Sequence, residues 1–209
     1  MSFMERMNSF HLDILKEIGN IGAGNAATAL SLLVNRKIDM SVPSARIVTF
    51  KEMMELAGGA DEPVCAVFLR IEGDAPGSMY FILSIDQADL FVQSLTSSDY
   101  SFHQTPYDEM AMSALQEMGN ILAGSYLSAL SDFTNLSLMP SVPAVNVDMF
   151  GALMSFGLYE VSKESDQCIV IETLITDSSK MDKAVKGYFF LLPDPDSFEI
   201  IFQSLGVQE

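Results

Sequence analysis

The sequence EIGNIGAGNAATALS at residues 17–31 returns as EMGNILAGSYLSALS at residues 117–131. The two stretches are identical at nine of fifteen positions and lie one hundred residues apart. So many identical positions at a fixed spacing indicate an internal duplication. The chain is therefore predicted to contain two copies of one structural unit.

Each copy carries the same frame of polar residues and a distant proline. A Glu is followed three residues later by an Asn, with a polar residue four positions before the Glu and a Pro 23 positions after the Asn. The first frame consists of Asp13, Glu17, Asn20 and Pro43, and the second of Ser113, Glu117, Asn120 and Pro143. A function for this chain must explain why the Glu and the Asn occur twice.

The duplication extends over nearly the whole chain. Apolar runs of strand length at 64–71 and 78–83 match those at 168–175 and 187–192, and FVQSL at 91–95 matches IFQSL at 201–205. Each repeat then reads as helix, strand, short helix, hairpin and helix, which favours an α+β fold. We expect a single domain over residues 1–209, with repeats at about 8–98 and 105–209. Its pseudo-two-fold, mixed or antiparallel sheet would have the two long helices on one face.

Composition restricts the classes of partner. A chain of 209 residues with 49% hydrophobic residues can bury a sizeable core. Its 28 acidic and 11 basic residues give a net charge of −17, which disfavours nucleic acid and membrane surfaces as partners. No window resembles a transmembrane helix or a signal peptide, so we expect a cytoplasmic protein. A duplicated unit can satisfy its own dyad, so a monomer is expected.

The first long helix is predicted over residues 8 to about 35. At 100° per residue, an apolar arc would face the core, and the opposite stripe would hold Asp13, Glu17, Asn20 and Gly24. The arc consists of Leu15, Ile18, Ile21, Ala29, Leu32 and Leu33. Gly19 would allow close helix packing, and Gly24 would let another molecule approach the polar stripe. The second long helix is predicted to start at Thr105-Pro106, with Thr105 as its cap.

No metal site is predicted. Cys65 and Cys168 lie in apolar runs and read as small buried side chains. His11 and His103 are not near a Cys in sequence, so no zinc-type spacing is present.

The Glu and Asn of each frame form only part of an active site. At i and i+3 on a helix, their Cβ atoms lie roughly 5–6 Å apart, so a carboxylate and a carboxamide stand side by side. A carboxamide can hold a water in line with a phosphorus, and positioning supplies most of the catalysis in phosphoryl hydrolysis. Because no nucleophile, base or phosphate loop accompanies the pair, the remaining groups would come from a partner. Taken alone, such a pair is also what an ordinary solvent-exposed helix face would contain.

The two complete frames, together with GNIGAG, GNILAGSYL and VDMFGA, resemble the signature of the CheC/CheX/FliY family of chemotaxis phosphatases. The resemblance covers essentially the full chain. It implies hydrolysis of the phospho-aspartate of the response regulator CheY. Glu17 and Glu117 would contact the regulator's lysine, and Asn20 and Asn120 would direct the attacking water.

The resemblance also implies roles for neighbouring groups. Asp13 and Ser113 would orient or cap, and Gly24 and Gly124 would support each site. The chain would need no cofactor of its own, because Mg²⁺ would be bound by the regulator.

A second partner implied by the resemblance is the receptor deamidase CheD, whose binding raises phosphatase activity in such proteins. Asp148, Met149 and Phe150 are candidates for its docking surface, because this segment departs from the repeat. The alternative is that the apolar residues here form the core face of a short helix.

Two non-catalytic functions remain open. One is an assembly module like the middle domain of a flagellar switch protein, and the other is an adaptor that binds CheY or CheD without turnover. Flagellar switch proteins usually carry a further C-terminal domain, so a chain that ends at Glu209 would favour the phosphatase.

Overall fold

The computed structural model describes residues 9–96, 100–161, 167–177 and 184–206. The ends of the predicted repeats at residues 8, 97–98 and 207–209 lie outside these ranges. In chain order, the first repeat contains α1 (Ser9–Val34), β1 (Ile38–Thr49), α2 (Phe50–Leu56), β2 (Pro63–Gly73), β3 (Gly77–Ser84) and α3 (Ile85–Thr96). The second contains α4 (Glu109–Thr134), β4 (Leu138–Pro140), β5 (Ala144–Met149), α5 (Phe150–Val161), β6 (Gln167–Asp177), β7 (Ala184–Pro193) and α6 (Pro195–Ser204).

The strands form one seven-stranded sheet in the order β1-β6-β7-β3-β2-β4, with β5 also paired to β2. Every pair is antiparallel. β1 of the first repeat pairs with the β6–β7 hairpin of the second, and β4 and β5 pair with the β2–β3 hairpin of the first. The repeats thus exchange their edge strands.

The two hairpins meet at the centre of the sheet, where β3 pairs with β7. Tyr80 lies opposite Phe190, and the matching runs YFIL at 80–83 and YFFL at 188–191 are 108 residues apart, so the pseudo-two-fold axis passes between Phe81 and its own counterpart Phe189. One residue along, Phe81 and Phe189 are paired and their rings stack with centroids 4.6 Å apart. The predicted α+β fold with internal two-fold duplication is therefore confirmed.

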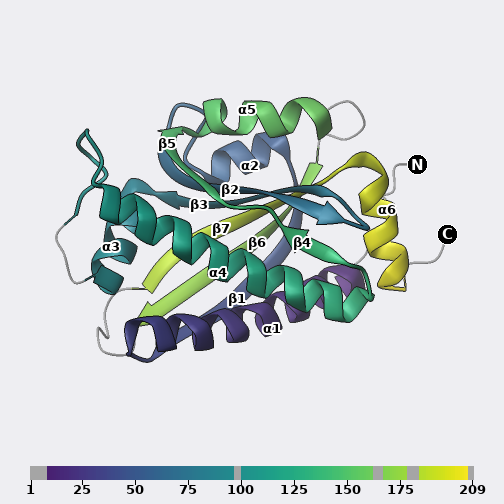
Figure 1. Ribbon diagram of the computed structural model, residues 1–209. Coiled ribbons are helices and arrows are strands. Elements are labelled where there is room, and N and C mark those ends of the chain that lie inside the picture. Colours follow the sequence, from purple (N-terminus) through teal and green to yellow (C-terminus); the bar gives the residue numbers. More distant parts are fainter. Residues whose placement is uncertain (1–8, 97–99, 162–166, 178–183, 207–209) are drawn as a thin grey trace.

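Both faces of the sheet are covered (Figure 1). α1 and α4 lie side by side on one face, and α2 and α5 lie on the other. Alternate residues of a strand accordingly enter different cores: Cys65 and Val67 pack under the long helices, whereas Val64 and Ala66 pack under the short ones. Because side chains of both orientations are buried, the strands are nearly continuous apolar runs rather than alternating ones.

α4 starts later than predicted. Asp108 is its N-cap and accepts hydrogen bonds from the backbone N–H groups of Met110 and Ala111 at 2.7 and 3.1 Å. Thr105 and Pro106 precede the helix and do not cap it. A carboxylate at the cap satisfies two otherwise unpaired donors and favours the helix dipole, which explains why Asp108 takes this position. At the other end, Asn35 after α1 and Asn135 after α4 both adopt positive φ, 49° and 56°.

The predicted apolar arc of α1 is only partly correct. Leu15 and Ile18 are buried, but Ile21, Leu32 and Leu33 are 40%, 80% and 56% exposed. The buried face of α1 consists of His11, Leu15, Ile18, Gly19, Gly22, Ala23, Ala26 and Leu30. This face holds many small residues, which a hydrophobicity wheel does not weight but which let α1 lie close to its neighbours.

Glycines set the approach of the long helices, although not as predicted for Gly19. A Cβ on Gly19 would meet Val42 of β1 at 3.3 Å, so Gly19 packs on the sheet and not on a helix. The close helix contact occurs at Gly22, where a Cβ would lie 2.9 Å from Cα of Tyr126 on α4. Of the glycines on the long helices, Gly119 is the most tightly packed, because a Cβ there would lie 2.3 Å from Cγ1 of Val67 on β2.

No helix in the described ranges combines the length and apolar character needed to cross a membrane.

Replacing Gly119 by Ala should destabilise the fold. The added methyl group would overlap Val67, whose branched side chain has little freedom to move, and we expect a loss of about 1–2 kcal/mol in the free energy of unfolding. Gly124→Ala is the matched control, since a Cβ there meets nothing within 4 Å. Because Ala has a higher helix propensity than Gly, this variant should gain up to about 1 kcal/mol in the free energy of unfolding. Urea unfolding of both variants measures the difference. Equal stability of the two variants would contradict this packing.

Candidate functional site

The two Glu/Asn pairs lie at equivalent positions of α1 and α4. Glu17 and Glu117 are exposed, as is Asn120, whereas Asn20 is half-buried. In each frame the segment that contains the proline lies beside the helix, at an edge of the sheet. We call Glu17 and Asn20 with this segment site one, and Glu117 and Asn120 with theirs site two.

In site one the Asn is tied to the strand. The Asn20 side-chain oxygen Oδ1 accepts a hydrogen bond from the backbone N–H of Val42 at 2.9 Å. This N–H is available because β1 bulges here: Ser41 pairs with Leu174 and Ser44 with Glu172, leaving residues 42 and 43 outside the ladder. Since a backbone N–H can only donate, the amide oxygen and not the NH₂ group of Asn20 must face the strand.

In site two the corresponding segment is turned over. Val42 is 2% exposed and Pro43 is exposed, but Val142 is 83% exposed and Pro143 is buried. Residues 141–143 are not part of a strand, and they separate β4 from β5. The Asn120 carboxamide makes no hydrogen bond to another described residue. Its oxygen is therefore free to accept a hydrogen bond from a ligand or a water.

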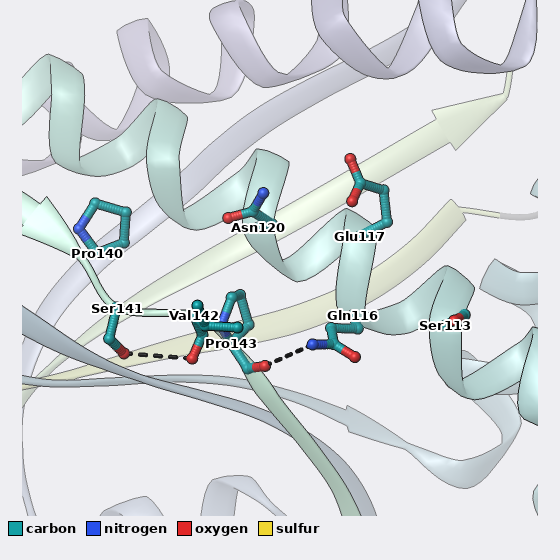
Figure 2. Close-up of a pocket in the computed structure, with 8 residues that line it drawn as sticks. All are labelled: Ser113, Gln116, Glu117, Asn120, Pro140, Ser141, Val142 and Pro143. Atoms are coloured by element: carbon teal, nitrogen blue, oxygen red, sulfur yellow. Dashed lines mark hydrogen bonds between the residues drawn. The ribbon is translucent and has the colours of Figure 1, made fainter.

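A cleft of about 340 Å³ lies between α4 and this segment (Figure 2). Its lining contains no basic side chain, so any cation in the site would come from a partner. Residues that line the cleft are Ser113, Gln116, Glu117, Asn120, Pro140, Ser141, Val142 and Pro143. Seven of the eight are polar residues or prolines, which suits a site that meets a charged surface group rather than an apolar ligand.

Gln116 was not singled out by the sequence. Its Nε2 donates to the backbone oxygen of Pro143 at 2.9 Å and so joins α4 to the turned segment (Figure 2). The same segment is held on its other side, where the Ser141 N–H donates to the Arg70 oxygen at 2.8 Å and Ser141 Oγ accepts from the Arg70 N–H at 2.9 Å. The only sequence signal was that Gln116 stands where the first repeat has Lys16.

The supporting residues differ between the two frames. Ser113 lines the cleft of site two, whereas Asp13 is exposed and its side chain makes no hydrogen bond to a described residue. A Cβ on Gly24 or Gly124 would meet nothing within 4 Å. The helix surface beside each pair is therefore open on the side where these glycines lie.

Neither cysteine is suited to act as a nucleophile. Cys65 and Cys168 are buried free thiols, as the sequence predicts, and burial raises the pKa of each to about 12. The thiols therefore stay protonated at neutral pH. Within the described ranges, no group of three or more His, Cys, Asp or Glu side chains is arranged to hold a metal ion.

The candidate docking segment divides between surface and core. Asp148 is exposed and Met149 is 52% exposed, both on β5. Phe150 is wholly buried against Phe190 under the short helices, with ring centroids 5.7 Å apart. For Phe150 the alternative reading as a core residue is therefore correct, because the first residue of α5 faces the sheet. Asp148 and Met149 remain candidates for partner contact.

The difference between the sites should be visible in amide hydrogen exchange. The Val42 N–H is hydrogen-bonded to Asn20 and should exchange slowly, whereas the Val142 N–H, which bonds no described residue, should exchange fast. NMR of the exchanging amides measures both. Asn20→Ala should accelerate Val42 and leave Val142 unchanged. Equal protection at Val42 and Val142 in the unsubstituted protein would contradict the described asymmetry.

Comparison with known proteins gives a family. A profile of the CheC-like family matches residues 10–47 and 110–147, and each match contains one of the two frames. The chain is 49% identical over 207 residues to the CheY-P phosphatase CheC of Bacillus subtilis, covering 99% of both chains. It is also 26% identical over 144 residues to the flagellar motor switch phosphatase FliY of the same organism, covering 69% of this chain and 37% of that protein.

Solved structures share the fold. The crystal structure of Thermotoga maritima FliY superposes with a TM-score of 0.75 at 20% identity, covering 97% of this chain and 99% of that one. The FliM middle domain from H. pylori superposes with a TM-score of 0.67 at 12% identity, covering 95% and 99%. The 49% identity with the Bacillus subtilis protein extends over 99% of both chains, and the family profile matches both frames. Because these two findings agree with the shared fold, the chain belongs to the CheC-like family.

Proposed function

We propose that this protein is a phosphatase that hydrolyses the phospho-aspartate of the response regulator CheY. One observation carries the proposal: in a chain that aligns end to end with a CheY-P phosphatase, Asn120 presents an unbonded carboxamide beside Glu117 at an open cleft. These two groups, without a basic residue in the cleft, do not form a complete active site. They are suited to complete the active site of a phosphorylated protein.

The carboxamide would position the nucleophile. Its oxygen accepts a hydrogen bond from a water, which turns a lone pair of that water toward the phosphorus. The water oxygen then bonds to phosphorus as the bond to the aspartyl oxygen breaks, releasing inorganic phosphate and the free aspartate carboxylate. Because positioning supplies much of the rate in phosphoryl transfer, a single oriented water is an adequate contribution from this chain.

The carboxylates of Glu17 and Glu117 would anchor the partner. An exposed carboxylate next to the amide can pair with a lysine of the regulator, which fixes the distance between the Asn and the phosphoryl group. The regulator would also hold the Mg²⁺ that neutralises charge on the transferred phosphoryl. The supporting geometry is the single helix turn between each Glu and its Asn, which keeps anchor and amide in a constant relation.

The two sites should not contribute equally. At site one, the oxygen of Asn20 already accepts a hydrogen bond from the Val42 N–H. To bind the water, Asn20 must use its remaining lone pair or break the hydrogen bond to Val42. A hydrogen bond of this kind contributes about 1 kcal/mol, which corresponds to roughly a fivefold handicap in rate. Site two carries no such bond and should be the faster site.

Replacing both Asn20 and Asn120 with Ala should abolish the acceleration of CheY-P dephosphorylation. Of the single variants, Asn120→Ala should lose more activity than Asn20→Ala, because its amide is unbonded in the free protein. The decay of radiolabelled CheY-P against added protein measures all three variants. Asn25→Ala, on the exposed side of α1 outside the frame, controls for the substitution. Acceleration that persists in the double variant would show that these amides do not position the water.

We also propose that CheD binds at the exposed edge of β5. The supporting observations are the exposure of Asp148 and Met149 and the absence of a matching surface in the first repeat, where Val48 is buried. An exposed carboxylate next to an exposed thioether offers one charged and one adaptable apolar contact.

Asp148→Lys should weaken CheD binding at least tenfold while leaving the basal phosphatase activity unchanged. Reversal of one interfacial charge replaces attraction by repulsion, and Asp148 lies on a different element from either Glu/Asn pair. Calorimetry with purified CheD measures the affinity. Asp132→Lys, an exposed acidic residue on α4, is the matched control. Unchanged CheD affinity in Asp148→Lys would remove this surface from consideration.

The assembly module is the second candidate function, since the FliM middle domain shares the fold. It is distinguished by turnover: an assembly module or an adaptor would bind CheY-P without shortening its lifetime. We further propose that the protein acts in the cytoplasm and as a monomer, because its two repeats already pair with each other through β3 and β7. Light scattering during the phosphatase assay tests the monomer.

A further inference from the structure

We propose that Gln116 is a positioning residue that keeps site two open. It does so by holding the 141–143 segment in the turned-over arrangement, so that no backbone N–H occupies the amide oxygen of Asn120. This inference rests on the proposed phosphatase function and assigns to site two a residue outside the repeated frame.

The two frames have the same backbone plan, which makes their difference informative. Residues 42–43 lie opposite the single residue Thr173 between paired flanks. In the second frame the paired flanks are Pro140 with Ile71 and Ala144 with Phe68, and because Ser141 bonds Arg70, residues 142–143 lie opposite the single residue Leu69. Each proline segment is therefore a two-for-one irregularity at an edge of the sheet. Nothing in the ladder itself dictates which of the two residues points inward.

The direction of the irregularity decides what happens to the Asn. With Val42 inward, the N–H of residue 42 bonds Asn20. With Val142 outward and Pro143 inward, Asn120 has no backbone partner, and the turned segment forms a wall of the cleft. The alternative arrangement is available to site two in principle, because Val142, like Val42, has an N–H to donate.

Gln116 stabilises the outward arrangement directly. Its bond to the Pro143 oxygen runs from one turn before Asn120 on α4 to the inward-facing residue of the segment. The side chain of Lys16, at the same place on α1, makes no hydrogen bond to a described residue, and Pro43 is exposed. The site with the Gln bond has the free amide, and the site without it has the occupied amide.

Pro140 offers a competing cause, because it has no N–H and stands where the first repeat has Met40. A proline at the end of β4 could terminate the strand by itself and leave Gln116 a bystander. The two causes predict different variants to be active, so the experiment includes both.

The test measures site two alone, in an Asn20→Ala background, with CheY kept phosphorylated by a small phosphodonor. Gln116→Met has similar length and no donor, and Gln116→Glu has the same shape and no donor. Both should lower kcat roughly three- to tenfold with little change in KM, the size expected for one hydrogen bond. Pro140→Met should leave the exchange of the Val142 amide unchanged, because the Gln116 bond to Pro143 still holds the segment. Amide exchange should slow at Val142 in the two Gln116 variants, a readout that a loss of general stability would not give.

The same Gln116→Met substitution in an Asn120→Ala background is the matched control. Site two is already disabled there, so site-one activity should be unchanged, and a decrease would indicate general damage. The proposal is overturned if Gln116→Met leaves kcat and Val142 exchange unaltered, or if Pro140→Met alone slows Val142 exchange to the same extent. If the Asn20→Ala/Asn120→Ala protein retains full activity, the phosphatase assignment of these sites fails, and that outcome is distinct from a failure of the Gln116 proposal.

Discussion

The exchange of edge strands between the repeats is the constraint on which the rest of the structure depends. β1 finds its hydrogen-bonding partner in β6 of the other repeat, and β4 and β5 find theirs in β2. A single repeat would leave a hairpin and a separate strand with unpaired backbone groups and a half-covered apolar face. Pairing β3 with β7 joins the hairpins, and α1 and α4 can then cover a continuous sheet. Residues of both repeats thus contribute to the core on each face of the sheet.

This arrangement places both functional segments at sheet edges. An edge strand has a ladder on one side only, so a bulge or a break there costs fewer hydrogen bonds than it would in a central strand. At the bulge of β1, the N–H of Val42 points toward Asn20 and bonds it. The 141–143 segment instead turns away from Asn120. The helices that carry each Glu and Asn are meanwhile fixed by close contacts at Gly19 and Gly119. A rigid helix beside an adaptable edge lets duplicated sites diverge without a change in the fold.

The regular part of the fold was predictable because it depends on local patterns. Apolar runs such as 168–175 gave the strands, and the spacing of the repeats gave the pseudo-dyad. The start of α4 was misplaced because Thr105-Pro106 and Asp108 are both reasonable start signals, and only the bonds to Met110 and Ala111 distinguish them. The exposed Leu32 and Leu33 were misassigned because periodicity locates an apolar arc but not how far along the helix its neighbours reach.

The sequence by itself determined the duplication, the strand-forming segments, and the pairing of one carboxylate with one carboxamide on each long helix, since spacing along a helix fixes which side chains are neighbours. Only the tertiary structure decided that Asn20 is bonded and Asn120 is not, that Gln116 reaches Pro143, and that Phe150 lies in the core. These facts depend on contacts between segments 22 to 40 or more residues apart, such as Asn20 with Val42 and Phe150 with Phe190. The same frame of residues can meet its strand in two ways, and the choice between them is made by packing across the chain rather than by the frame itself.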